Sequence, residues 1–439
     1  MTPEIRAAAY WKIGLRILPI LFITYFVNFL DRVNVSFAKL SMLSSLQMDE
    51  KAYGFAVGLF FWGYFLFEVP SNLMLYRFGA RRWLALLAVL WGILTVLTAF
   101  VTALWQLSVL RFLLGTAECG FFPGIILYLT WWYPKALRVR IMAGFISAIP
   151  ISGIFGGPLS GGIMKLSNGW LGLENWRWLF LIEAAPCFLV ALWIFKGLID
   201  RPGMAPWLDA SERDAIESEL AREERERAEQ GSSQHASQAF TNPVVWQLCA
   251  LYFCQMMGLY GISFWLPKII KNLGWKDDFQ IGLVSAIPWL CAVVIMFLLG
   301  TLADRSGDRR YYAIVAALLG SFGFFASSYF DNSCLRLGCL ALAASGVMGL
   351  MAISWSFPAA LLSAQAAAAG IALINSFGNL GGFFSPTLVG YITPPSGSLS
   401  NGMSLTGGFM LLAAFLLFIF RSLQPEQKVM AAAKMEAAS

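Results

Sequence analysis

The sequence predicts an all-α membrane protein with twelve transmembrane helices, and two observations carry this prediction. Of the 439 residues, 58% are hydrophobic and 13% are charged, which is too little charge to cover the surface of a soluble protein of this length. The apolar residues also stand in uninterrupted runs of about 20 residues, the length that crosses a bilayer as a helix. Backbone groups in lipid must be paired internally, and these runs do not alternate as barrel strands do, so helices are the spanning structure that fits.

The spans divide six and six around one long polar stretch. We place them at 14–36, 53–75, 83–102, 104–130, 141–164, 177–199, 244–269, 279–302, 311–330, 334–358, 366–391 and 405–423. The predicted domains are an N-terminal six-helix half (1–199), a solvated cytoplasmic helix and linker (200–242) and a C-terminal six-helix half (243–439). The first apolar run has no small-residue cleavage site, so we expect it to be retained as a helix.

Basic loop residues predict that both termini face the cytoplasm, as in a multi-pass protein of the cell (inner) membrane. The short segments on the side of the termini carry fifteen Lys and Arg in five groups of three, the last being Arg421, Lys428 and Lys434. The segments on the other side carry eight, among them Lys39. Lys and Arg favour the cytoplasmic side of a membrane protein.

A loop motif repeats in the two halves at a constant offset of 228 residues. The loop after span 8 reads Gly300-Thr-Leu-Ala-Asp304-Arg305-Ser-Gly307-Asp-Arg309-Arg310, and the loop after span 2 carries Arg77, Gly79 and Arg81 at matching positions. The repeat resembles the G-x-L-A-D-R-x-G-R-R motif of the major facilitator superfamily, which implies the major facilitator fold, although Tyr76 replaces the motif's Asp in the first copy. We predict a gating role for both copies, since Gly allows a tight turn and the charges can cap and bridge helix ends.

Six ionisable side chains fall inside the predicted spans, where each unpaired charge costs about 3 kcal/mol or more. They are Asp31, Arg32, Glu68, Arg111, Glu118 and Glu183. Arg111 and Glu118 are seven residues apart, so they lie on one helix face about 10 Å apart along the axis. We hypothesise two cross-helix pairs, Asp31 with Arg111 and Glu118 with Arg32. The alternatives are a purely structural charge network, or a position of Asp31 and Arg32 at the outer membrane edge.

The other two carboxylates are assigned structural roles. Glu68 precedes Pro70 near the cytoplasmic end of span 2, and we expect it to latch onto a basic loop residue. Glu183 is expected to serve packing in span 6. Gly120, Pro123 and Gly124 follow Glu118 and predict a bend in span 4.

The charged segments in combination resemble the anion:cation symporter family. The similar stretches are Asn28-Phe-Leu-Asp31-Arg32, Phe61-Trp-Gly-Tyr64 with Glu68-Val-Pro70-Ser-Asn72, Arg111-Phe-Leu-Leu-Gly115-Thr-Ala-Glu118, and Trp176-Arg177-Trp178-Leu-Phe180 with Glu183. The resemblance implies uptake of organic anions, coupled to protons in most bacterial members. It also implies that Arg32 and Tyr64 contact substrate, that Asp31 and Glu118 are the protonation sites, and that Arg111 is their ion-pair partner.

The C-terminal half offers neutral polar groups as further substrate contacts. The candidates are Gln255 and Tyr260 in span 7, Ser354 and Ser356 in span 10, and Asn375 and Asn379 in span 11. Amides can bind hydroxyls or a carboxylate without charge, and the alternative is hydrogen bonding between helices. We therefore expect anion capture and proton coupling in the N-terminal half and specificity in the C-terminal half.

The sequence thus predicts a monomeric secondary transporter that imports a small organic carboxylate with protons, with no cofactor, metal or nucleic acid. Buried carboxylates can carry the protons because burial favours their neutral form, whereas the single histidine, His235, lies in the linker. The alternatives are anion exchange or efflux on the same fold, and a metabolite-sensing receptor, for which the linker is short. An enzyme is not expected, since no metal cluster, nucleophile–His pair or phosphate loop is present.

Overall fold

The structure is a computed structural model that describes residues 3–229, 241–361, 364–394 and 397–419. Several residues discussed above lie outside the described residues, namely His235, Arg421, Lys428 and Lys434.

The described residues form helices and no strand. The N-terminal half contains α1 (Pro3–Val33), α2 (Val35–Ser45), α3 (Glu50–Phe78), α4 (Ala80–Thr98), α5 (Leu104–Glu118), α6 (Phe121–Thr130), α7 (Lys135–Ile146), α8 (Ala148–Leu166), the turn η1 (Trp170–Gly172) and α9 (Asn175–Gly197). The linker contains η2 (Pro202–Met204) and α10 (Ala210–Glu229). The C-terminal half contains α12 (Pro243–Asn272), α13 (Asp278–Ser306), α14 (Arg309–Tyr329), α15 (Ser333–Ser354), α16 (Ser356–Leu361), α17 (Ala364–Asn379), α18 (Gly381–Ile392) and α19 (Ser400–Ile419).

Within the described ranges, eleven helical runs are long and apolar enough to cross a bilayer. They confirm an all-helical membrane fold and correspond to the predicted spans 1–10 and 12. The predicted span at 366–391 is not among the eleven. It consists of two short helices, α17 and α18, that meet at Leu380.

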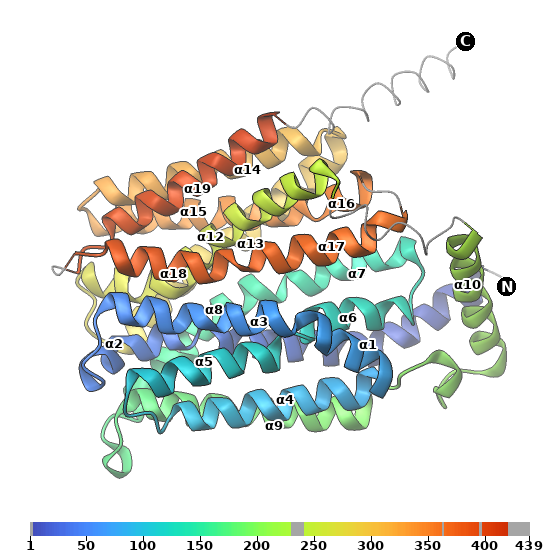
Figure 1. Cartoon of the computed structure of the whole chain (residues 1–439), viewed down its shortest axis with the longest axis horizontal. Coiled ribbons are helices and arrows are strands. Elements are labelled where there is room, and N and C mark those ends of the chain that lie inside the picture. The colour runs from blue at the N-terminus through green and yellow to red at the C-terminus, as the bar shows by residue number, and fades with distance from the viewer. Residues whose placement is uncertain (1–2, 230–240, 362–363, 395–396, 420–439) are drawn as a thin grey trace.

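The two halves lie side by side with their helices along the long axis of the molecule (Figure 1). The start of α1 and the linker helix α10 lie at one end of the bundle, which we call the terminal end. The turn between α2 and α3 lies at the opposite end, which we call the distal end. The linker helix is held by ion pairs rather than fully solvated, because Lys12 of α1 lies 2.7 Å from Glu212 and Arg138 of α7 lies 2.9 Å from Glu223.

Five of the described spans are interrupted in mid-course. The break at Ser147 in the fifth span has no candidate site residue beside it, but the other four do. The first span breaks at Asn34, just after Arg32, and the fourth breaks after Glu118, where the sequence predicts a bend. The tenth and eleventh break at Trp355 and Leu380, next to Ser354 and Asn379. Interrupted helices free backbone polar groups, and in transporters they are found where irregular backbone lines a cavity.

The halves meet most closely toward the distal end, where backbone packs on backbone. The α8–α13 pair is the most extensive contact between the two halves. A Cβ atom on Gly282 of α13 would lie 2.2 Å from the carbonyl oxygen of Gly157 on α8. In the same way, a Cβ atom on Gly54 of α3 would lie 2.2 Å from the carbonyl oxygen of Pro386 on α18. Only glycine permits these approaches, so the small residues fix how tightly this end closes.

We expect Gly282→Ala to lower the thermal unfolding midpoint in detergent, since overpacking a close contact costs about 1–3 kcal/mol. Gly338→Ala in α15 is the matched control, because a Cβ atom there meets nothing within 4 Å. That control should unfold at or slightly above the wild-type temperature, since Ala is favoured over Gly inside a helix. Equal midpoints for the two variants would contradict the close α8–α13 contact.

Candidate functional site

Arg32 lies buried at the centre of the bundle and contacts both halves. Its Nε and Nη2 donate to Glu118 Oε2 of α5 at 3.1 and 2.9 Å. Its Nη1 donates to the hydroxyl of Tyr260 on α12 at 3.2 Å, and its Nη2 donates also to Asn28 Oδ1 at 3.2 Å. The predicted Glu118–Arg32 pair is therefore present, with the glutamate fully buried and the arginine 5% exposed.

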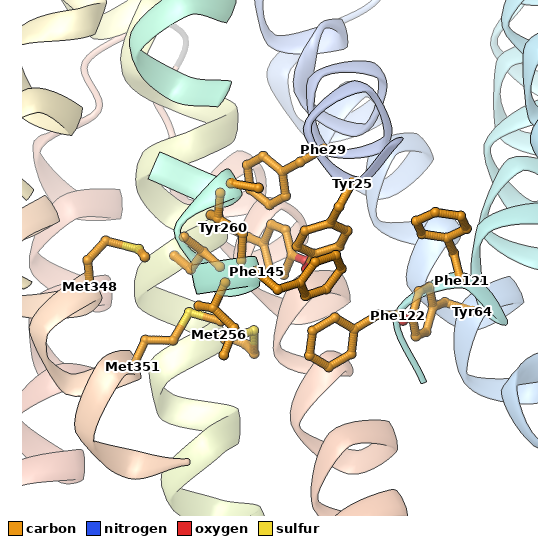
Figure 2. Close-up of a cluster of buried hydrophobic side chains, with 14 of the residues drawn as sticks. Tyr25, Phe29, Tyr64, Phe121, Phe122, Phe145, Met256, Tyr260, Met348 and Met351 are labelled. Atoms are coloured by element: carbon orange, nitrogen blue, oxygen red, sulfur yellow. The ribbon is translucent and has the colours of Figure 1, made fainter. Parts of the chain in front are cut away.

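Aromatic rings enclose this ion pair. The Arg32 guanidinium carbon lies 5.1 Å from the ring centre of Phe60 and 5.4 Å from that of Tyr64. Tyr64 is thus beside Arg32, as the predicted substrate contact requires. Figure 2 shows Phe29, Tyr64 and Tyr260 within a larger cluster of aromatic and methionine side chains drawn from both halves. Rings stabilise a cation through their faces while keeping water away from it, which strengthens the ion pair.

The predicted ion pair between Asp31 and Arg111 is wrong in this structure. Asp31 accepts hydrogen bonds from Thr95 of α4 at 2.7 Å and from Asn34 at 3.2 Å, and makes no ion pair with any described residue. Adjacent residues on a helix point about 100° apart. Arg32 turns toward α5 and Asp31 toward α4. Asp31 lies near enough to Arg111 to act on it as a charge but makes no ion-pair contact with it.

Arg111 is a buried cation that makes no ion-pair contact among the described residues. It is 2% exposed, its Nη1 donates to the Arg32 carbonyl oxygen at 3.5 Å, and its Nε has no hydrogen-bond partner among the described residues. A buried guanidinium that is short of acceptors is well suited to bind an anion.

The neutral candidates of the C-terminal half are only partly brought together. Ser354 donates to Gln255 Oε1 at 3.0 Å, which leaves Gln255 Nε2 without a partner in the described structure. Ser356 donates to the carbonyl oxygen of Ile353 at 2.7 Å. Asn379 donates to the backbone carbonyl of Asn375 at 3.0 Å. The hydrogen bonds of Ser356 and Asn379 are thus local, whereas Tyr260 reaches across to Arg32.

Glu68 does not latch onto a basic loop residue, and this expectation is corrected. Its two carboxylate oxygens accept hydrogen bonds from Asn375 Nδ2 at 2.6 Å and from Ser376 Oγ at 2.8 Å, both on α17 of the other half. Glu183 is buried within the N-terminal half and accepts from Ser160 of α8 at 2.6 Å, in keeping with a packing role.

A third buried cation is Lys39, which the sequence analysis assigned to the outer loops. The structure corrects this, because α2 continues the first span past residue 36 and Lys39 is 1% exposed. Its Nζ lies 2.5 Å from Glu50 Oε2 and 3.3 Å from the ring centre of Trp265 on α12. Lys268 of α12 lies 3.5 Å from the other Glu50 oxygen. This cluster joins the halves at the distal end. The one feature of the sequence that could have predicted the burial of Lys39 is the helical run that continues through it.

The two copies of the repeated loop place arginines at helix ends. Gly79 ends α3 at φ +85°, and Gly307 ends α13 at φ +72°, so both turns favour glycine. Arg81 donates its side chain to the Phe195 carbonyl oxygen of α9 at 2.6 Å. In the second copy it is Arg310 that reaches the last turn of α19, donating to the Leu417 carbonyl oxygen at 2.8 Å.

The remaining predicted gating residues make fewer contacts. Asp304 pairs with Arg309 within its own loop at 3.2 Å, on the exposed surface. Arg77 stacks on the neighbouring Phe78 ring. Arg305 makes no ion pair or side-chain hydrogen bond among the described residues, and a Cβ atom on Gly300 would meet nothing within 4 Å. The backbone N–H of Arg81 donates to Asp200 at 2.8 Å, a partner that the motif did not reveal because it stands 119 residues away.

A family model described as the Major Facilitator Superfamily matches residues 21–386. The chain belongs to the major facilitator superfamily. The repeated loop and the all-helical membrane fold agree with this membership, which is that of a transporter family.

Similar proteins agree on transport and differ in cargo. A protein of Agrobacterium vitis named "Putative tartrate transporter" is 40% identical over 97% of this chain and 94% of its own length. A protein of Acinetobacter baumannii named "Quinolone resistance transporter" is 36% identical over 94% of this chain and 95% of its own. Among solved structures, a D-xylose–proton symporter shares the fold, with a TM-score of 0.75 at 16% identity, covering 93% of this chain and 98% of that one.

We expect Tyr260→Phe to destabilise the protein, because it leaves an N–H of a buried guanidinium without an acceptor at a cost of about 1–3 kcal/mol. Tyr252→Phe on the same helix is the matched control, since Tyr252 is buried but makes no hydrogen bond among the described residues. Thermal unfolding of both variants in detergent measures the difference. A Tyr260→Phe protein as stable as the control would contradict the contact between the halves.

Proposed function

We propose that this transporter imports an organic carboxylate anion together with protons by alternating access. The observation that carries the proposal is the buried Arg32–Glu118 pair with its hydrogen bond to Tyr260 on the other half. Three functions would then meet here. Arg32 can bind a carboxylate, Glu118 can carry a proton, and Tyr260 links the two halves.

The coupling follows from competition for one guanidinium. In the structure, Glu118 takes up two donor positions of Arg32, its Nε and one Nη2 position. A proton on Glu118 removes the charge that holds the arginine, and a substrate carboxylate can then take its place as a two-point partner. The substrate brings the missing negative charge, so the loaded site is close to neutral and tolerates transfer through the bilayer.

Asp31 and Arg111 form the second part of the proposed site. Asp31 is held by two neutral donors, Thr95 and Asn34, so it can carry a proton without first releasing a cation. Arg111 has donor capacity to spare, and we assign it a second contact with the anion. The neutral Gln255–Ser354 pair offers a free amide N–H for a substrate hydroxyl.

Alternating access would come from rocking of the halves around this centre. We place the termini in the cytoplasm and the protein in the inner membrane as a monomer. The distal Lys39–Glu50 cluster would then close the outer face, and the α3–α17 contact at Glu68 would lie toward the inner face.

Efflux is the second candidate, because one relative at 36% identity bears the name of a quinolone resistance transporter. The same buried charges would then exchange a proton against cargo instead of binding both together. Anion exchange on the same site is a third form of the reaction.

Uptake of labelled tartrate, sugar acids, phthalate, hydroxyphenylacetate and a quinolone into proteoliposomes separates these candidates. Proton-driven accumulation of one acid that collapses with a protonophore supports the proposal. Uptake that ignores the proton gradient and is stimulated by internal anion would overturn symport in favour of exchange. Quinolone accumulation driven by protons that move in the opposite direction would overturn symport in favour of efflux.

We expect Glu118→Gln to abolish proton-driven accumulation while substrate exchange across the membrane persists. The amide keeps the shape of the side chain but can neither bind nor release a proton, and as a neutral acceptor it competes for Arg32 more weakly than the carboxylate does. Glu183→Gln is the matched control, because this buried carboxylate accepts from Ser160 within its own half, and the variant should accumulate substrate as the wild type does. Proton-driven accumulation of the acid by Glu118→Gln at the wild-type level would contradict the proposal.

A further inference from the structure

Glu68 is a buried carboxylate whose hydrogen-bond partners are all neutral. It is 2% exposed and its two oxygens accept from Asn375 and Ser376. No cation of the described structure forms an ion pair with it. The titratable side chains around it are Tyr64 on its own helix, Cys119 at the α5–α6 break and Tyr252 on α12. A carboxylate without a cation at this depth is expensive. Glu183 is also cation-free, but its partner Ser160 lies in the same half, whereas both partners of Glu68 lie in the other half.

The position of Glu68 puts it on the way from the central ion pair to the terminal end. It stands four residues after Tyr64, so both lie on one face of α3 about one helical turn apart. Tyr64 covers the Arg32 guanidinium at 5.4 Å. Beyond Glu68, α3 continues to the loop at Gly79 at the terminal end.

Both contacts of Glu68 join the two halves, so they must break whenever the halves part at that end. While the contact is closed, the carboxylate is out of water and is most easily kept there with a proton bound. Ser376 suits this, because a hydroxyl can accept from a carboxylic acid or donate to a carboxylate. When the contact opens, water reaches Glu68 and the proton can leave on that side.

We propose that Glu68 is a third proton-coupling carboxylate, which binds its proton while Asn375 and Ser376 close the terminal end and releases it when they separate. The inference rests on the proposed proton symport and adds a proton to it. Unlike Glu118, Glu68 holds no arginine, so its proton moves without competing with the substrate for a cation.

The test is the proton-to-substrate ratio, measured with the full chain in proteoliposomes and with the acid that the uptake panel identifies. The ratio is calculated from the membrane potential or pH difference at which net flux of that acid stops. Glu68→Gln should still transport, with the ratio lowered by one proton per substrate. Glu183→Gln is the matched control, because its partner Ser160 lies in the same half, and its ratio should equal that of the wild type. An unchanged ratio in Glu68→Gln overturns the inference.

A second variant covers the case in which Glu68→Gln fails to fold or to transport. Ser376→Ala keeps Glu68 and its bond to Asn375 but removes one donor, so it should shift the pH dependence of uptake and leave the ratio unchanged. A pH profile identical to that of the wild type overturns the inference. Failure of the proposed symport can be told apart from failure of this inference. If the protein is not a proton symporter, the wild type itself will show a proton-to-substrate ratio of zero.

Discussion

The rest of the structure depends on one constraint, the cost of holding the Arg32 guanidinium inside a bilayer. A charge at such depth needs partners, and Arg32 has Glu118 from α5, Tyr260 from the other half and two ring faces. The first span breaks at Asn34, just after Arg32, and the fourth breaks directly after Glu118. Because these partners come from helices of both halves, loss of any one of them changes a contact between the halves.

Much of this arrangement could be predicted from the sequence, and what failed has identifiable physical reasons. The seven-residue spacing of Arg111 and Glu118 and the rarity of charges in apolar runs were enough to predict the Glu118–Arg32 pair. They could not tell that Asp31 would turn to Thr95, since that depends on the rotation of α1. Lys39 was misassigned because the first span continues as α2 past its predicted end. Glu68 was misassigned because its partners lie on α17, more than 300 residues away.

Contacts between the halves are of a different kind at each level of the bundle. The distal end combines glycine-mediated backbone packing with the Lys39–Glu50 pair against Trp265. The centre has the charged Arg32 bridge to Tyr260. Toward the terminal end the contact is a carboxylate on two neutral donors. Because the three contacts differ in chemistry, protonation can weaken the contact at one end of the bundle while the contact at the other end stays closed. Alternating access requires this.

The central claim is that Glu118 and the substrate carboxylate compete for Arg32, and equilibrium binding tests it most directly. The dissociation constant of the acid identified by uptake would be measured from acid to neutral pH for the wild type and for Glu118→Gln. The account predicts that wild-type affinity weakens as pH rises, by up to about tenfold per pH unit for one linked proton, because ionised Glu118 reclaims the arginine. Glu118→Gln should bind tightly with a flatter profile. An equal pH dependence in both proteins would contradict the account.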